Sequence, residues 1–355
     1  MKQMKFESYS EKQFRNKITY FSFWLSFFVI GIHTYNVQIY GLSEKTDLLS
    51  KFVLKWEQLI RSLSNVCVPF FFLISGYLFF RTFEWSKLFD KYKSRFRTIV
   101  VPYIIWCSVY YLYYCLLSRI AGISDFINSG SSIDFTVRTW GDWLWNQSYY
   151  TLWFLKELIV MIICTPIIYL VLRNYKHIPV GSIVVCFALL KAGGILNPEK
   201  LELGASVFYL LGAFIGINYK NAPLKKNSKL TMIARITFVG IVIWQLLTIS
   251  NVEDANIFMC LLLCVSLWWS FDGFSYQEKL KWWYGISFFV YCIHDIFLEG
   301  FEKIFLLLFG TNSIFAILDY AFMPIFVMII CVFTAAILRK YFSTLWRILT
   351  GGRGE

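Results

Sequence analysis

The hydrophobic run Ile18–Tyr40, ITYFSFWLSFFVIGIHTYNVQIY, places the strongest constraint on what this chain can fold into. It is long enough to cross a bilayer as a helix, which takes about 20 apolar residues. At 100° per residue, one face of such a helix carries Ser22, Ser26, Val29, His33 and Asn36. A polar stripe on a membrane helix must face protein or water, so this run predicts a helix packed inside a bundle.

His33 makes this run a candidate site as well as a candidate span. An ionisable side chain inside a membrane costs roughly a few kcal/mol or more to insert, and by default it is a candidate functional residue. The structural alternative is a histidine that is satisfied by a neighbouring helix.

Composition extends the membrane assignment to the whole chain, because 58% of its 355 residues are hydrophobic and 16% are charged, against about 25% charged in soluble domains. Apolar runs of roughly 17–25 residues predict an all-α polytopic membrane bundle of about ten transmembrane helices. The predicted spans are 18–40, 64–80, 99–121, 151–172, 178–196, 204–219, 232–250, 256–271, 284–308 and 314–338. Residues 1–17 and 339–355 are then expected to be cytoplasmic segments on either side of one membrane domain, 18–338.

The distribution of Lys and Arg predicts the orientation. With a cytoplasmic N-terminus, the inner segments hold 24 of these residues and the outer segments hold 9, which fits the positive-inside rule with both termini in the cytoplasm. The net charge of +12 is therefore interpreted as a topology signal, and no nucleic-acid partner is expected. The nine cysteines lie in apolar runs without metal-ligand spacing, so neither disulfides nor a metal site is predicted.

Two connecting segments have helical patterns. Apolar residues recur at helical spacing in 49–63, which predicts an amphipathic helix lying on the outer surface. The inner connection WSKLFDKYKSRFRTIVVPY carries a basic stripe of Lys87, Lys91 and Arg95, with Arg97 close by. This stripe suits anionic lipid headgroups, and equally the phosphates of a nucleotide-like donor.

Charged residues also occur inside later spans. Lys156 and Glu157 lie one turn inside the predicted span 151–172, and each needs a partner on another helix. The span 284–308 carries His294 at mid-depth, followed by Asp295, Glu299 and Glu302, which we interpret as a water-facing rim rather than a proton path. The small residues Gly212 and Gly216 predict close helix packing.

Four stretches together resemble the acyltransferase-3 family of bacterial integral membrane acyltransferases, which includes O-acetyltransferases that act on surface polysaccharides. They are FFVIGIHTYN with His33, VPFFFLISGYLFF, KSRFRTIVVPYIIW, and the pair TLWFLKELIVMIICTPIIYL and ISFFVYCIHDIFL. In order and spacing they cover nearly the whole chain. The resemblance implies a multi-pass protein of the cytoplasmic (inner) membrane that uses acetyl-CoA or another acyl-CoA as donor.

The resemblance also implies site residues. His33 would be catalytic, and Lys91, Arg95 and Arg97 would bind the donor. Substrate contacts would come from the matching motifs, at Asn36, Ser75, Tyr77, Trp153, Lys156, Glu157 and His294. In one departure, many members carry an arginine eleven residues before the first-span histidine, and Ser22 stands there in this chain. Arg95, Arg97 or Lys156 would then have to substitute for that arginine, unless this branch works differently or is not a competent transferase.

Transfer of an acyl group from a thioester to a sugar hydroxyl needs a base, for which histidine is suited. The chain has no GxSxG elbow, which favours direct transfer with His33 as the base over a serine acyl-enzyme. Two other functions remain open on the sequence. The intramembrane charges would also suit a transporter of a lipid-linked glycan, and Ser22 would suit a non-catalytic scaffold.

Overall fold

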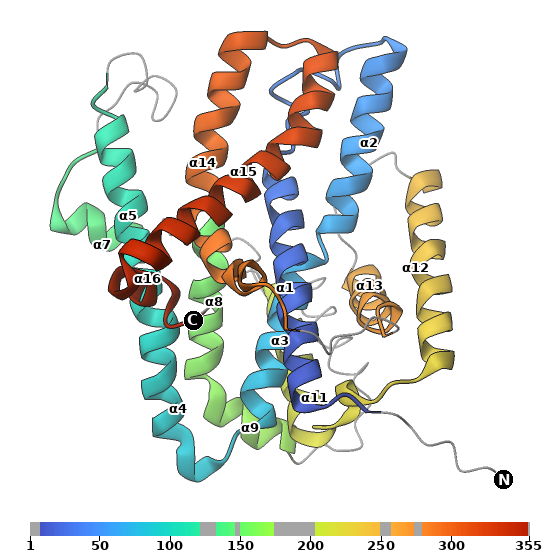
Figure 1. Cartoon of the computed structure of the whole chain (residues 1–355), viewed down its shortest axis with the longest axis vertical. Coiled ribbons are helices and arrows are strands. Elements are labelled where there is room, and N and C mark those ends of the chain that lie inside the picture. The colour runs from blue at the N-terminus through green and yellow to red at the C-terminus, as the bar shows by residue number, and fades with distance from the viewer. Residues whose placement is uncertain are drawn as a thin grey trace.

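The computed structural model describes residues 8–120, 133–145, 150–173, 203–248, 257–272 and 279–353. Within these ranges the protein is all-helical and contains no β-strand, which confirms the predicted fold class. The predicted span 178–196 lies outside the described residues. Figure 1 shows α1 running through the middle of the molecule, with α2, α14 and α15 reaching one end and α4, α9 and α11 the other.

The helices have the following bounds: α1 Glu11–His33, α2 Leu48–Ser64, α3 Cys67–Arg81, α4 Leu88–Arg95, α5 Val101–Leu117, α7 Val137–Trp145, α8 Trp153–Ile163, α9 Thr165–Arg173, α11 Leu203–Asn218, α12 Ser228–Thr248, α13 Ile257–Ser270, α14 Ser287–Phe309, α15 Ser313–Tyr341 and α16 Ser343–Thr350. A π-helical turn, η2 (Phe96–Val100), joins α4 to α5, and a 3₁₀ turn, η5 (Trp282–Ile286), precedes α14.

Among the described residues, four helical segments are long and apolar enough to cross a membrane: Leu48–Arg81, Trp85–Leu117, Ser228–Thr248 and Ser313–Tyr341. The pair α8 and α9 adds a fifth if it forms one span, bent by 63°. The bend falls next to Pro166, as expected for a residue that cannot continue the hydrogen-bond ladder of a helix. A multi-pass membrane protein is therefore supported, while the total of ten spans and the cytoplasmic termini stay predictions.

The first helix differs from the predicted span at both ends. Ser10 and Gln13 form a capping box that starts α1 at Glu11. At the other end, the Thr34 hydroxyl donates to the Ile30 carbonyl at 2.8 Å, and turns follow. The prediction of a helix up to Tyr40 is therefore wrong, and His33 is the last helical residue.

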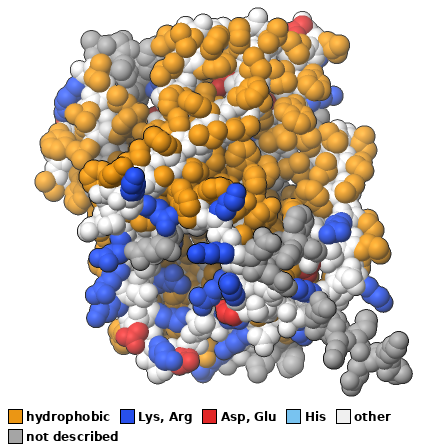
Figure 2. All heavy atoms as spheres, in the orientation of Figure 1, with side chains coloured by type: hydrophobic (Ala, Val, Ile, Leu, Met, Phe, Trp, Pro, Cys, Tyr) orange, Lys and Arg blue, Asp and Glu red, His pale blue; other side chains and the backbone are white. Residues whose placement is uncertain are grey.

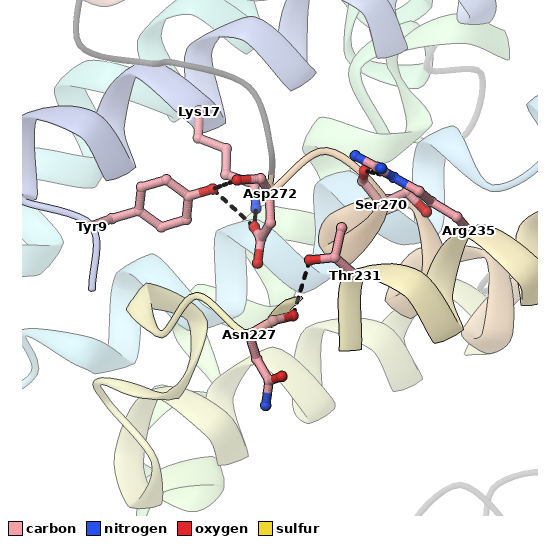
Figure 3. A network of polar contacts seen from close by, with 7 residues as sticks. All are labelled: Tyr9, Lys17, Asn227, Thr231, Arg235, Ser270 and Asp272. Carbon is pink, nitrogen blue, oxygen red and sulfur yellow. Dashed lines mark hydrogen bonds and ion pairs between the residues drawn. The ribbon is translucent and has the colours of Figure 1, made fainter. Parts of the chain in front are cut away.

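Helix α1 is held at its start by a buried ion pair. Lys17 and Asp272 are 0% and 3% exposed in their side chains, and the Lys17 ammonium donates to the Asp272 carboxylate. The Tyr9 hydroxyl donates to the same carboxylate at 2.9 Å, and Trp268 lies 4.0 Å from the ammonium. Figure 3 shows this contact beside the bond from Arg235 of α12 to the Ser270 carbonyl of α13. Lys17 is therefore a buried structural cation.

The amphipathic helix predicted for 49–63 is present as α2, and its position on the outer surface stays a prediction. Helix α2 packs against α1, α12 and α15, and its Glu57 is fully buried. Val53 and Leu59 of its apolar stripe are buried in these contacts, whereas Leu49, Phe52 and Trp56 are exposed.

The close approach of α3 and α11 confirms the predicted packing role of the small residues in α11. A Cβ on Gly212 would lie 2.0 Å from the Leu73 carbonyl oxygen, and one on Gly216 would lie 2.7 Å from the Tyr77 oxygen. On the facing helix, a Cβ on Gly76 would lie 2.2 Å from the Tyr209 oxygen. Only glycine leaves room for these two backbones.

Figure 2 shows one face of the molecule. Hydrophobic side chains cover the half that contains the upper parts of α14 and α15, and most Lys and Arg side chains lie in the other half. The exposed apolar residues of α15 include Phe322, Phe326 and Phe333. Such a broad apolar surface suits contact with lipid.

Candidate functional site

Two histidines from distant parts of the sequence meet inside the bundle. His33 ends α1, His294 lies in α14, and their ring centroids are 5.3 Å apart with the planes inclined by 53°. His294 is 0% exposed, whereas His33 is partly exposed. His33, the residue that the sequence singles out, is therefore the more exposed residue of the pair.

Hydrogen bonds fix the protonation of His294. Its Nδ1 lies 3.0 Å from the Val290 carbonyl oxygen and 2.9 Å from that of Tyr291. A nitrogen facing two acceptors carries the proton, so in the neutral ring Nε2 keeps its lone pair. Nε2 is buried and has no hydrogen-bond partner among the described residues. This lone pair is available to a neighbouring N–H donor or to a substrate.

A cavity of about 330 Å³ lies close to the histidine pair. On α1 its lining runs from Ile18 to Val29, and on α14 it runs from Ser287 to Tyr291. Val29 precedes His33 by four residues and Tyr291 precedes His294 by three, so each helix brings the cavity to within about one turn of its histidine. Much of the remaining wall is apolar and comes from α3 and α8: Val68, Phe71, Ile74, Leu78, Phe154, Leu155, Leu158 and Ile162.

The polar lining of this cavity is cationic. Arg95 and Arg353 both line it, together with the hydroxyls of Ser22, Ser75 and Ser287. Among the described residues, neither arginine has a carboxylate within ion-pair distance. Unpaired guanidinium groups in an otherwise apolar cavity favour an anionic ligand.

A second pocket adjoins the first. The two share four lining residues, Ile18, Ser22, Ser287 and Arg353. The second pocket adds further cations from α1, α15 and the segment before α14, namely Lys12, Lys279, Lys281 and Arg339. Within the described part of the chain no carboxylate lines it, so the two pockets form a path with cations at its mouth and histidines near its end.

The three predicted donor-binding cations do not act together. Arg95 faces the cavity, whereas the Lys91 ammonium donates to the Phe79 carbonyl at 2.8 Å and to the Thr82 hydroxyl at 2.9 Å. Lys91 therefore satisfies groups at the end of α3. Arg97 is exposed and lines neither pocket.

Two predicted residues of α3 have different surroundings. Ser75 lines the cavity. Tyr77 lies on another face, where its hydroxyl donates to the Lys220 carbonyl at 2.6 Å and its ring contacts Phe14 at 5.9 Å between centroids. The structure therefore does not bring Tyr77 to the histidine pair.

The predicted residues of α8 border the cavity without lining it. Lys156 donates to the Trp145 carbonyl at 3.0 Å, and Glu157 is buried. Trp153 lies 6.2 Å from the Phe72 ring. The cavity-facing residues of this helix are instead apolar, Phe154, Leu155, Leu158 and Ile162.

Asn36 belongs to a buried polar network beyond the end of α1. Its side-chain amide donates to the Asp319 carboxylate at 3.2 Å, and its backbone N–H donates to Glu57 at 3.4 Å. The Tyr40 hydroxyl also donates to Asp319, at 3.3 Å. These bonds tie the chain after His33 to α2 and α15, away from the cavity.

The acidic run of α14 is not a simple water-facing rim. Asp295 is buried, and Glu299 accepts a hydrogen bond of 2.7 Å from the Tyr114 hydroxyl of α5. An Oε1 atom of Glu302 is also buried. Because α5 and α15 pack around α14, the acidic run faces protein for much of its length. The prediction of a water-facing rim is therefore wrong for Asp295.

Arg353 lines both pockets but was not among the site residues predicted from the sequence, because it lies in the predicted tail 339–355. The available signal was an amphipathic segment, 343–350, followed by two glycines, since glycine commonly ends a helix.

Comparison with known proteins identifies the chain's relatives. The acyltransferase domain family matches residues 16–338. The succinoglycan biosynthesis protein ExoH of Rhizobium meliloti (strain 1021) is 24% identical over 316 residues, which cover 82% of this chain and 80% of that protein. No solved structure matches the chain.

Proposed function

Because this chain belongs to the acyltransferase-3 family, we propose that it is a membrane O-acyltransferase that moves an acyl group, most simply acetyl, from acyl-coenzyme A to a hydroxyl of a cell-surface or lipid-linked glycan. The glycan acceptor is supported by the name of the ExoH relative, which refers to the biosynthesis of a polysaccharide. The location would be the cytoplasmic (inner) membrane of a bacterium.

The observation that carries the proposal is the position of the histidine pair, one turn beyond a cavity with unpaired arginines. The arginines suit the phosphates of the donor, and the apolar wall suits an extended neutral arm with a thioester at its end. With the cation-rich half of the molecule facing the cytoplasm, coenzyme A would enter from the side where it is made.

His33 would act as the general base, since it is the partly exposed residue of the pair. It takes the proton of the acceptor hydroxyl while that oxygen attacks the thioester carbonyl carbon. The new C–O bond forms, the C–S bond breaks, and the leaving thiolate takes the proton back from the imidazolium. His294, with its free Nε2 lone pair, would accept a hydrogen bond from the second N–H of His33 and stabilise the imidazolium.

The test is acyl transfer by purified protein with His33→Gln, which keeps a polar side chain of similar size at the end of α1. We expect a loss of about 10²–10⁴-fold in turnover, the range for general-base catalysis, with unchanged thermal stability. His294→Gln should lower turnover less, because Gln still presents an acceptor. Turnover of the His33 variant at the wild-type rate would remove His33 as the base.

A cellular experiment separates the enzyme from the transporter. Mass spectrometry of surface glycans from cells with and without the protein should show loss of an ester-linked acyl group. Unchanged acylation together with stalled glycan export would instead favour a transporter.

A further inference from the structure

The C-terminal segment after α15 returns to the bundle. Helix α16 docks through Trp346, whose ring lies 5.0 Å from Phe289 of α14. From α5, the Trp106 indole N–H donates to the Leu349 carbonyl at 3.0 Å. Helix α16 is thereby fixed against α5 and α14, and residues of α14 line the cavity.

Two glycines then direct the chain toward η2. Gly351 has φ +62°, and a Cβ there would lie 2.5 Å from the Thr98 carbonyl oxygen. Gly352 follows with φ +78°. A residue with a side chain fits neither the left-handed conformation nor the space at Gly351, so this local sequence is needed to bring Arg353 under α5.

The Arg353 guanidinium makes its hydrogen bonds to the protein through one edge. Its Nη1 donates to the Thr98 carbonyl at 2.7 Å and to the Thr350 carbonyl at 3.2 Å. The guanidinium also lies over the Phe288 ring, 4.2 Å from the centroid. Its Nη2 and Nε have no hydrogen-bond partner among the described residues, so the other edge of the group is available to a ligand.

Arg95 approaches the same space from α4. Its nearest aromatic contact is Phe79, at 5.5 Å, and the described residues offer it no hydrogen bond. Burial, together with the charge of Arg95, lowers the pKa of Arg353 to about 10, so Arg353 stays charged at neutral pH. Repulsion between two like charges that lie near each other without a carboxylate disfavours the empty cavity and favours the binding of an anion.

We propose that Arg353 and Arg95 together bind the phosphate groups of the donor, so that the C-terminal segment forms part of the donor site. This inference deepens the proposed function and rests on it for the identity of the donor. Phosphate oxygens match the guanidinium fork, and the Ser22 and Ser287 hydroxyls, which line both pockets, can supply further donors. From Ser22 to His33 the helix rises about 16 Å, which an extended arm bound at the arginines would follow to the histidines.

An anionic lipid headgroup carries the same phosphate chemistry. We assign the site to the donor because the cavity continues from the arginines toward the histidine pair, where a headgroup has no function. The experiment therefore compares the two sources.

The first arm measures coenzyme A binding by calorimetry to full-length protein in nanodiscs of neutral phosphatidylcholine. Arg353→Gln should weaken binding by about tenfold or more, the scale of a lost charge-assisted pair. Arg353→Lys should weaken it less, because lysine keeps the charge but not the fork. Arg95→Gln should behave like Arg353→Gln, and the exposed Arg347→Gln of α16 should bind as the wild type does.

The second arm repeats the measurement in phosphatidylglycerol nanodiscs, where coenzyme A affinity should still depend on Arg353. Equal affinity of wild type and Arg353→Gln in phosphatidylcholine would overturn the proposal. So would binding that depends on Arg353 for phosphatidylglycerol alone. Because binding needs no turnover, a wild type that binds coenzyme A through Arg353 but transfers no acyl group would refute the proposed function and leave the phosphate site standing.

Discussion

The buried pair of Lys17 and Asp272 offers a sharp test of how α1 is positioned. Lys17→Met keeps the length of the side chain and removes its charge, which leaves the Asp272 carboxylate buried with the Tyr9 hydroxyl as a remaining donor. We expect a large loss of stability, because the carboxylate cannot reach water at 3% side-chain exposure.

The magnitude follows from the degree of burial. Removing one partner of a buried ion pair typically costs about 3–5 kcal/mol, whereas replacing both partners with uncharged groups is often close to neutral. The double variant Lys17→Met with Asp272→Asn should therefore be more stable than Lys17→Met alone. Arg15 is the matched control two residues earlier, since its side chain is 78% exposed in its contact with Glu11 and such surface pairs are worth about 0–1 kcal/mol.

The assay is the free energy of unfolding in mixed micelles, measured by SDS titration with tryptophan fluorescence as the signal. The four variants are Lys17→Met, Asp272→Asn, the double variant and Arg15→Gln. If Lys17→Met unfolds as easily as Arg15→Gln, or if the double variant loses the sum of the two single losses, Lys17 is not a buried structural cation and the account of the start of α1 is wrong.

Two further predictions concern the cavity and its walls. Ser22→Arg should restore part of the coenzyme A affinity lost in Arg353→Gln, because Ser22 lines the same cavity, whereas Ser22→Gln should not restore it. Calorimetry on the two double variants measures the affinities. If Ser22→Arg restores no affinity, Arg353 has a structural role alone. Gly212→Ala should lower the free energy of unfolding by about 1–3 kcal/mol, the usual cost of overpacking, because its Cβ would meet backbone atoms of α3. The control is Gly240→Ala of α12, whose Cβ would have no atom within 4 Å, and it should be neutral in the same SDS titration.

Local sequence patterns predicted much of the helical framework. Hydropathy located α3, α5, α11, α14 and α15 to within a few residues, because each apolar run must be removed from water as a unit. The spacing of Gly212 and Gly216 predicted close helix packing, because small residues let two backbones approach, and the structure shows that the partner is α3. His33 and His294 were both singled out as ionisable groups within apolar runs, and the structure brings them into contact.

Other features depend on contacts that hydropathy does not contain. The end of α1 at His33 is marked by the Thr34 hydroxyl, although the apolar run continues to Tyr40. An amphipathic pattern such as that of α2 suits a membrane surface as well as a helix interface, and it does not reveal the contacts that α2 makes with α1, α12 and α15. Lys91 and Arg95 share a helical face. Lys91 nevertheless donates to a carbonyl at the end of α3, whereas Arg95 lines the cavity.

In the proposed donor site, Arg353 would supply from the C-terminal segment a cation that α1 lacks at Ser22. Counted along the chain, it is one more cation in a basic tail, 331 residues away from Ser22. Its position depends on a series of contacts: Trp346 docks α16, Gly351 allows the chain to pass Thr98, and Phe288 supports the guanidinium. Each of these contacts is specific in the structure, although no distinctive sequence pattern marks it. Because Ser22 leaves room where a longer side chain would project into the cavity, the serine and the returning arginine are complementary, and a change at either position should be felt at the other.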